Sequence, residues 1–183
     1  MMDKKGKGDQ ERKEKQMTGL FIGRFQPFHN AHLKDIEAAL KEVDHLIIGI
    51  GSSNEERTQN NPFSFKERKE MIEKTLRARG ITQWEIVGIP DVPDDEQWMV
   101  YIEKNVGRFD IAFMSNDYMQ DFFKSRKYRV KRLPFVKGMS ATKIRRLIAE
   151  GKRWRDQVPK EVEEYLLKKN LVKIIKDLTQ KSP

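Results

Sequence analysis

The sequence contains no cysteine, and only three of its 183 residues are histidine. Without cysteine, the chain can form no disulfide, no thiolate nucleophile and no cysteine-ligated zinc site. No apolar run approaches the roughly 20 residues that a membrane-spanning helix needs. No apolar segment of signal-peptide length follows the charged N-terminus. These absences predict a cytoplasmic protein that makes no membrane contact.

Glycine-rich phosphate loops are missing as well. The first predicted turn from strand to helix contains neither G-x-x-x-x-G-K-[ST] nor G-x-G-x-x-G. This turn is therefore neither a P-loop nor a dinucleotide-binding fingerprint. Any phosphate chemistry at this place has to come from other residue types.

The composition that remains is that of a soluble globular protein, with 37% apolar and 36% charged residues. The formal net charge is +9, and it is concentrated in residues 124–155, where thirteen Lys and Arg accompany one acidic residue. A local excess of positive charge indicates an anionic partner. Taken alone, a solvated basic face is the better explanation of this basic segment.

Residues 1–16 contain no apolar side chain beyond the opening methionines, so they have nothing with which to form a core. We expect a disordered charged tail over residues 1–17 and a single domain over residues 18–183. Within that domain, short continuously apolar segments alternate with segments of helical periodicity. The predicted strands are residues 18–23, 45–51, 84–90, 110–115 and 128–134.

The predicted helices have recognisable starts and stops. Ser64 and Glu67 form a capping box, Ser140 is an N-cap, and Gly80 and Gly151 are helix stops. The predicted helices are residues 30–43, 64–80, 94–106, 118–125 and 140–151, with one or two more after Pro159. This pattern predicts an α/β fold with a doubly wound, parallel five-stranded sheet and C-terminal helices. Ligands of such sheets bind at the carboxyl ends of the strands.

Two of the three histidines lie in the segment GRFQPFHNAH, residues 23–32, at the first turn from strand to helix. Their spacing places His29 and His32 on one side of the first helical turn. A zinc site would need a third ligand, and His45 lies at the far end of the same helix. The pair can be structural, satisfying polar groups near a helix cap, or it can donate hydrogen bonds to phosphate.

A second segment, GMSATKIRR, residues 138–146, opens the helix within the basic segment. Ser140 caps this helix, and the hydroxyl of Thr142 in its first turn can meet a phosphate together with nearby amides. Arg145 and Arg146 point about 100° apart, so at most one of them faces a ligand squarely. An ordinary amphipathic helix remains an alternative. Both segments lie where strands give way to helices, so a triphosphate across the sheet edge would meet both.

The two segments together resemble the nucleotidyltransferase superfamily. GRFQPFHNAH is similar to its G-x-F-x-P-x-H-x-G-H signature, and GMSATKIRR is similar to its [ST]-x-T-x-I-R-R partner near the C-terminus. The finer resemblance is to archaeal-type nicotinamide-mononucleotide (NMN) adenylyltransferases. It also includes the stretches GSSN, NPFSFKER, DVPDDEQW, SND and GKRWRDQVP. Ala31 stands where the signature has glycine, and its methyl group is expected to narrow the nucleotide pocket slightly.

The resemblance implies a Rossmann-like nucleotidyltransferase fold, a homo-oligomer, and transfer of AMP from ATP to NMN, giving NAD and pyrophosphate. It implies catalytic roles for Arg24, His29, His32 and Arg145. The residues implied to bind ATP are Gly23, Arg24, Phe25, His29, His32, Ser140, Thr142 and Arg145. The residues implied to bind the acceptor nucleotide are Asp91, Trp98, with its ring stacked on the pyridine, and Asn116. Mg²⁺ is implied to enter with ATP, and we expect no metal ligand from protein side chains.

Other readings of these residues stay open. Asp91 can serve the turn before Pro93, and Trp98 lies at helical spacing with Tyr101 and Ile102, which favours a core position. The two phosphate segments do not separate NMN from phosphopantetheine, FMN or a cytidylyltransferase substrate as acceptor. In the alternative of a nucleic-acid-binding module, which we disfavour because it leaves the histidine pair unexplained, the basic segment binds the backbone and its aromatics stack on bases. These aromatics are Tyr128, Phe135 and Trp154.

Overall fold

The computed structural model describes residues 16–133 and 138–180, and these form an alternating series of strands and helices. The tail predicted over residues 1–17 lies outside this description up to residue 15. The strands are β1 (Thr18–Gly23), β2 (His45–Ile50), β3 (Trp84–Gly88), β4 (Ile111–Met114) and β5 (Val130–Arg132). The helices are α1 (Asn30–Ala39), α2 (Phe65–Ala78), α3 (Asp95–Asn105), α4 (Asp117–Ser125), α5 (Ala141–Ala149), α6 (Lys160–Lys168) and α7 (Leu171–Gln180), with a 3₁₀ turn, η1 (Arg155–Gln157).

Each predicted element forms, and the differences lie at element ends. The first helix was predicted to reach residue 43, but α1 ends at Ala39 with Leu40 as its C-cap. The chain has to turn within the few residues left before β2 begins at His45. Val43 still packs into the core, with an exposed fraction of 6%. The apolar spacing therefore continued past the point where the helix ended.

The five strands form one parallel sheet, as the sequence predicts, and their order in it is β3-β2-β1-β4-β5. Strand β1 lies at the centre, with β2 on one side and β4 on the other. The chain winds outward from β1 through β2 to β3, then crosses back to β4. The carboxyl end of β1 is thus the switch point, where a doubly wound sheet opens a crevice for a ligand.

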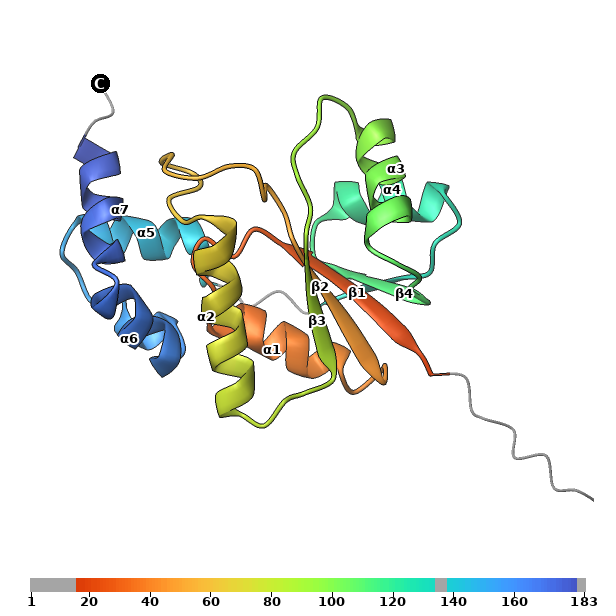
Figure 1. Ribbon diagram of the computed structural model, residues 1–183, viewed down its shortest axis with the longest axis horizontal. Helices are drawn as coiled ribbons and strands as arrows, with labels where there is room; N and C mark the ends of the chain where they lie inside the picture. The colour runs from red at the N-terminus through yellow and green to blue at the C-terminus, as the bar shows by residue number, and fades with distance from the viewer. Residues whose placement is uncertain (1–15, 134–137, 181–183) are drawn as a thin grey trace, which may run out of the picture.

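Helices cover both faces of this sheet (Figure 1). On one face, α1 and α2 bury their apolar sides in a core cluster that also takes in residues of α5, α6 and α7. On the other face, α3 and α4 pack around Met99, Ile102 and Phe123 in a smaller cluster. The strands are buried on both sides, which explains their continuously apolar sequences.

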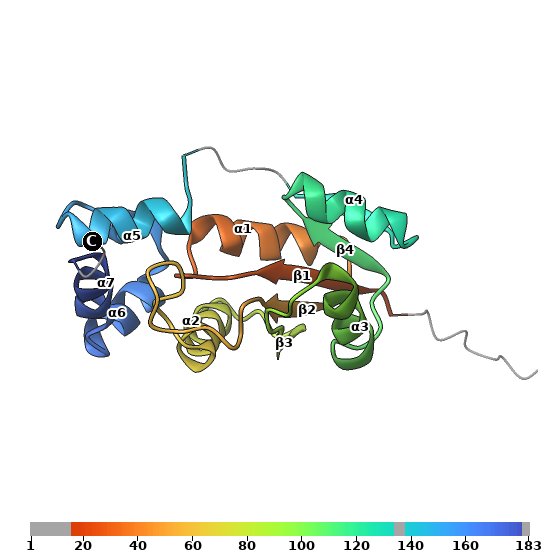
Figure 2. The same ribbon diagram turned by 90° about the horizontal axis from the view of Figure 1, so that it is seen from above.

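The three C-terminal helices form a layer beside α2, on the side of the molecule away from α3 and α4 (Figures 1 and 2). Helix α6 packs against α2, and α7 packs against both α5 and α6. An ion pair between Arg79 Nη1 and Glu161 Oε2, at 2.9 Å, joins the end of α2 to α6. This layer places the start of α5 next to the start of α1.

A fully buried arginine on α2 holds the carboxyl ends of β1 and β2 together. Arg68 has an exposed fraction of 0%, and its guanidinium donates to the main-chain carbonyls of Arg24 at 2.9 Å, Gly51 at 2.7 Å and Ser52 at 2.9 Å. A fourth, longer bond goes from Nε to the carbonyl of Ser64 at 3.3 Å. Burial lowers the pKa of Arg68 to about 10, so the side chain remains a cation at neutral pH.

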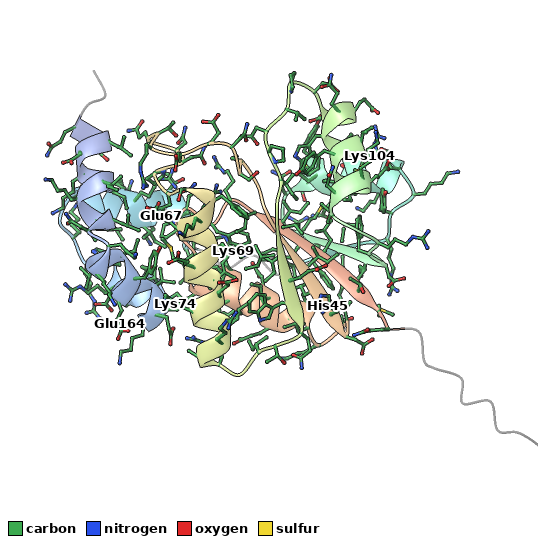
Figure 3. All side chains as sticks on the ribbon, viewed as in Figure 1. His45, Glu67, Lys69, Lys74, Lys104 and Glu164 are labelled. Atoms are coloured by element: carbon green, nitrogen blue, oxygen red, sulfur yellow. The ribbon has the colours of Figure 1, made fainter. Side chains whose placement is uncertain are left out.

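We predict that Arg68→Met lowers the free energy of unfolding by about 3–5 kcal/mol, because buried carbonyls at two strand ends lose their donor. Denaturant unfolding of the purified variant measures this. Lys74→Met is the matched control, because Lys74 is an exposed cation on the same helix (Figure 3) and should change stability by less than about 0.5 kcal/mol. Equal stabilities of the two variants would contradict the role given to Arg68.

Candidate active site

The turn between β1 and α1 has a strained backbone that packing holds in place. Phe25 has φ of +52°, a conformation that is rare for a bulky residue, and its ring is buried. A Cβ atom at Gly23 would lie 2.9 Å from that ring, so glycine is required for the ring to pack there. The buried amide of Gln26 also exchanges hydrogen bonds of 3.0 Å with the main-chain N–H and C=O of Phe63. The turn is thereby fixed to the loop before α2.

The two histidines cap helix α1 for each other. His29 is the N-cap, and its Nδ1 accepts from the main-chain N–H of His32 at 3.4 Å. In return, Nδ1 of His32 accepts from the main-chain N–H of His29 at 3.4 Å. Their rings stack with centroids 3.6 Å apart. The structural reading and the phosphate reading of the pair are therefore compatible, because capping uses only one nitrogen of each ring.

The environment keeps both imidazoles neutral at physiological pH. Burial lowers the pKa of His29 to about 4, and burial together with the neighbouring His29 lowers the pKa of His32 well below its ordinary value. A neutral imidazole carries one proton, and since each Nδ1 accepts a hydrogen bond, that proton resides on Nε2. Each histidine therefore offers an Nε2–H donor beside the N-terminus of α1.

Helix α5 brings a second N-terminus to the same place. Ser140 is its N-cap, with Oγ accepting from the main-chain N–H of Lys143 at 3.2 Å. Arg145 is 8% exposed, and its Nη1 donates to the carbonyl of Gln26 at 2.9 Å. Arg146, its neighbour, is exposed on another side of the helix. As the helical geometry predicts, only one of the two arginines lies toward the turn between β1 and α1.

The N-termini of α1 and α5 enclose a cavity of 280 Å³, named here the α1–α5 cavity. Seven of the residues implied to bind ATP line it: Arg24, Phe25, His29, His32, Ser140, Thr142 and Arg145. Ala31 lines it too, and its main-chain N–H donates to Met139 Sδ at 3.2 Å. Two helix N-termini, two guanidinium groups and two imidazole donors around one cavity make a site for a polyanion.

A larger cavity of 520 Å³ adjoins the first at the ends of β1, β2 and β4 and at the starts of α3 and α4. We name it the α3–α4 cavity. The residues implied to bind the acceptor, Asp91, Trp98 and Asn116, all line it, and so does Gly23. Arg24 and Ser115 line both cavities. The structure thus places Gly23 on the second cavity rather than with the other residues implied to bind ATP.

The acceptor-side residues are held by local contacts. The main chain of Asp91 exchanges hydrogen bonds with the side chain of Asn54, at 2.8 Å and 3.3 Å. Trp98 packs edge-on against Phe123 with ring centroids 6.2 Å apart, yet it remains partly exposed and lines the cavity. Asn116 is the N-cap of α4, with its Oδ1 accepting from Met119 N–H at 3.1 Å. Trp98 therefore packs against the core on one side and lines the cavity on another.

Several residues of the site escaped the sequence analysis. The side-chain amides of Asn54 and Gln26 each exchange two hydrogen bonds with main-chain groups and so hold the loops of the site. No sequence pattern marks such a role. Asp35, three residues after His32, also lines the α1–α5 cavity. The spacing 29, 32, 35 on one helix was the signal that could have found it. The sequence analysis also missed Arg68, because a charged residue in a helix rich in charged residues is normally expected on the surface.

The described part of the basic segment, residues 124–133 and 138–155, does not form the stacking surface that the nucleic-acid alternative needs. Tyr128 stacks on Phe109 with centroids 5.1 Å apart, and its hydroxyl donates to Glu103 at 3.0 Å. Trp154 is buried in the larger core cluster. Phe135 lies outside the described residues. Several of the basic residues pair with carboxylates, as Lys131 does with Glu42 and Arg132 with Asp117, both at 2.7 Å.

The described residues contain no group of three or more His, Asp or Glu side chains that could hold a metal ion. Around the α1–α5 cavity the described lining is mostly hydrogen-bond donors and cations, with Asp35 as its one acidic side chain. Such a donor set fits a divalent ion that arrives already bound to phosphate oxygens, and not one held in a protein cage. Within the same residues, no helix is long and apolar enough to cross a membrane.

The chain is similar to proteins of one known family. The model of the cytidylyltransferase-like family matches residues 20–177. The chain is 42% identical over 154 residues to a nicotinamide-nucleotide adenylyltransferase of Thermococcus sibiricus, covering 82% of this chain and 83% of the relative. It is 40% identical over 159 residues to the protein of that name from Thermoplasma acidophilum, covering 86% and 88%.

A solved structure resembles the whole fold. It is a bifunctional NMN adenylyltransferase/ADP ribose pyrophosphatase from Francisella tularensis, with a TM-score of 0.72 and 25% identity. The match covers 92% of this chain and 58% of that one. The present chain therefore spans a little over half the length of the bifunctional protein.

The lowered pKa of His29 predicts a pH dependence of stability. The unfolded chain binds a proton on this histidine near pH 6.5, while the folded protein does so only near pH 4. Acid therefore favours the unfolded state: the stabilisation is complete above pH 6.5 and is lost as the pH falls toward 4. By pH 5 the loss attributable to His29 is about 2 kcal/mol.

Comparing His29→Asn with the wild type by denaturant unfolding at pH 7 and pH 5 isolates this contribution. Asparagine keeps an N-cap acceptor but does not titrate. The wild type should lose about 2 kcal/mol more than the variant over this interval. Parallel losses in the two proteins would show that His29 is not held neutral by the fold.

Proposed function

The chain belongs to the cytidylyltransferase-like family, and we propose that it is a nicotinamide-nucleotide adenylyltransferase, which transfers AMP from ATP to NMN to give NAD and pyrophosphate. The observation that carries the proposal is the pair of adjoining cavities that meet at Arg24. One is built for a polyanion, and the other, which is larger, has an indole on its wall. The curated relatives of this chain, about 40% identical to it, bear the name of the same activity.

The reaction joins two phosphate groups, and the junction of the cavities is where they would meet. An oxygen of the NMN phosphate attacks the α-phosphorus of ATP in line, forming one P–O bond. The bond from the α-phosphorus to the oxygen that bridges it to the β-phosphorus breaks, and this oxygen leaves with pyrophosphate. The attacking oxygen is already anionic, so no general base is needed, and catalysis consists of positioning and charge stabilisation.

Each group around the α1–α5 cavity then has a role that its geometry permits. Arg24 faces both cavities, so it can bring the two phosphate groups together against their mutual repulsion. The Nε2–H groups of His29 and His32 donate to oxygens of the α- and β-phosphates. Because these donors are neutral and fixed by the reciprocal cap, they need no reorganisation as charge develops.

The leaving pyrophosphate has a place to go. Ser140, Thr142 and Arg145 at the start of α5 are placed to bind the β- and γ-phosphates. Thr142 and Arg145 also line a third cavity, of 350 Å³, between α5, α7 and the loop before α2. Asn60 and Arg146 face this third cavity. Because it shares Thr142 and Arg145 with the α1–α5 cavity, we propose this third cavity as the exit of pyrophosphate.

Mg²⁺ enters this scheme with ATP. When bound, it neutralises charge on the phosphate oxygens, and the donor-rich lining leaves its coordination to those oxygens and to water. The residue roles given above do not depend on its position. The homo-oligomer implied by the family resemblance, and the cytoplasmic location, stay predictions. Light scattering on the purified protein measures the first of these.

A product assay tests the function and the choice of acceptor together. Purified protein, ATP and Mg²⁺ are incubated separately with NMN, phosphopantetheine and FMN, and the products are identified by mass spectrometry. We expect NAD and pyrophosphate only in the tube with NMN. A product in another tube would keep the chemistry and replace the acceptor. No adenylylated product in any tube would overturn the proposed function.

Replacement of His32 tests the phosphate role of the imidazoles. His32→Ala should lower kcat by about 10²–10³ while the protein still unfolds cooperatively, because one donor to the developing charge is lost. His45→Ala is the matched control, since His45 begins β2 at the end of the sheet away from α5 (Figure 3) and should leave kcat unchanged. Near-normal turnover of His32→Ala would remove the phosphate role from this histidine.

A further inference from the structure

One carboxyl group lines the α1–α5 cavity without a partner. Asp35 is the one acidic side chain among the described residues of its lining. Its Oδ1 is buried, and it finds no hydrogen-bond partner in the structure. A buried acceptor without a donor costs free energy, so such an atom calls for an explanation. None of the roles given above to the residues of this site uses Asp35.

The position of Asp35 on α1 fixes which part of a ligand it can meet. Asp35 follows Ala31 by four residues and His32 by three, so its side chain is a neighbour of each of them on the helix surface. Side chains on a helix lean toward its N-terminus. The carboxyl group therefore lies over the turn that contains Ala31 and His32. It lies farther from the N-terminus of α1 than the imidazoles do.

Charge decides what kind of group belongs there. The guanidinium groups of Arg24 and Arg145 and the N-termini of α1 and α5 define the phosphate end of the cavity. Burial raises the pKa of Asp35 to about 6, so the carboxyl group is mostly ionised at neutral pH. A carboxylate repels phosphate, so the portion of ATP beside Asp35 has to be uncharged. It also has to carry a donor for Oδ1.

The uncharged portion of ATP with hydrogen-bond donors is adenosine. Its donors are the exocyclic amino group of the base and the ribose hydroxyls. We propose that Asp35 is a nucleoside-binding residue, which accepts a hydrogen bond from an N–H or O–H group of the adenosine portion of ATP. The proposal rests on ATP being the ligand of this cavity, as in the proposed function. It makes Asp35 a determinant of nucleotide specificity.

Equilibrium binding tests this without the second substrate. The dissociation constants of ATP and of three analogues are measured by calorimetry, each with Mg²⁺. The analogues are purine riboside triphosphate, which lacks the amino group, and 2′-deoxy-ATP and 3′-deoxy-ATP, which each lack one hydroxyl. The proteins are the wild type, Asp35→Ala, Asp35→Asn, and Glu37→Ala as a control on an exposed position of the same helix.

The wild type should bind one of the analogues about 10- to 100-fold more weakly than ATP, because a hydrogen bond to a charged acceptor is lost. Asp35→Ala should bind ATP more weakly by a similar factor and no longer discriminate against that analogue. Asp35→Asn, which keeps an acceptor oxygen and the side-chain volume, should retain part of the discrimination. Glu37→Ala should behave as the wild type.

The identity of the discriminated analogue tells whether base or ribose supplies the donor. If Asp35→Ala weakens ATP and all three analogues equally, or binds every nucleotide more tightly, the proposal is overturned. It is also overturned if the affinity of Asp35→Ala changes only through its dependence on Mg²⁺, since that would make Asp35 a metal ligand. A wild type that binds ATP as expected but forms no NAD would instead reject the proposed function alone.

Discussion

The buried guanidinium of Arg68 is the interaction on which the geometry of the site depends. It holds the main-chain carbonyls of Arg24, Gly51 and Ser52, and so joins the carboxyl ends of β1 and β2. Two residues in these segments have strained backbones, Phe25 with φ of +52° and Ser52 with φ of +48°. Strained conformations persist only where surrounding contacts over-determine them. The side chain of Arg68 supplies such contacts. Its guanidinium donates to main-chain carbonyl groups and not to a carboxylate.

This arrangement gives the two cavities a common rigid edge. The carbonyl of Arg24 is fixed from behind, while its side chain extends into both cavities. Gln26 lies two residues after Arg24. Its main-chain carbonyl accepts a hydrogen bond from Arg145, and its side-chain amide donates one to the loop before α2. Contacts from α2, from the loop before it and from α5 therefore converge on Arg24 and Gln26. The main-chain geometry of the candidate site is therefore fixed by packing around the turn.

The sequence was enough to predict a doubly wound, parallel five-stranded sheet and the two segments that lie where strands give way to helices. Apolar strands and capped helices are marked by residues close together in the chain. Every strand and helix predicted from these local patterns is present in the structure, with differences at the ends. Residue type and position were enough to predict that His29 and Arg145 lie near each other, and both line the α1–α5 cavity. The site was not predictable where function depends on a long-range contact. Arg68 lies at helical spacing with the buried Met71, Ile72 and Thr75, and this spacing was the sole hint that it faces inward.

The basic segment shows the reverse case, a strong sequence signal whose meaning changed in three dimensions. Its charges are close together in the chain but separate on the molecule, where acidic residues from α3, from α4 and from the loop after α1 pair with several of them. Arg145 is buried at the site, while its neighbours Lys143 and Arg146 are not. Linear charge density says little about surface potential when the segment crosses a strand, a loop and a helix.

The reciprocal cap of His29 and His32 has a consequence for how the site responds to its surroundings. The imidazoles contribute dipoles of fixed direction, whereas Arg24 and Arg145 contribute full charges. Dissolved salt screens charges that water can reach, such as the exposed Arg24, and weakens hydrogen bonds from neutral donors much less. Salt should therefore weaken the binding of an anion at this site less than the two arginine charges alone would predict.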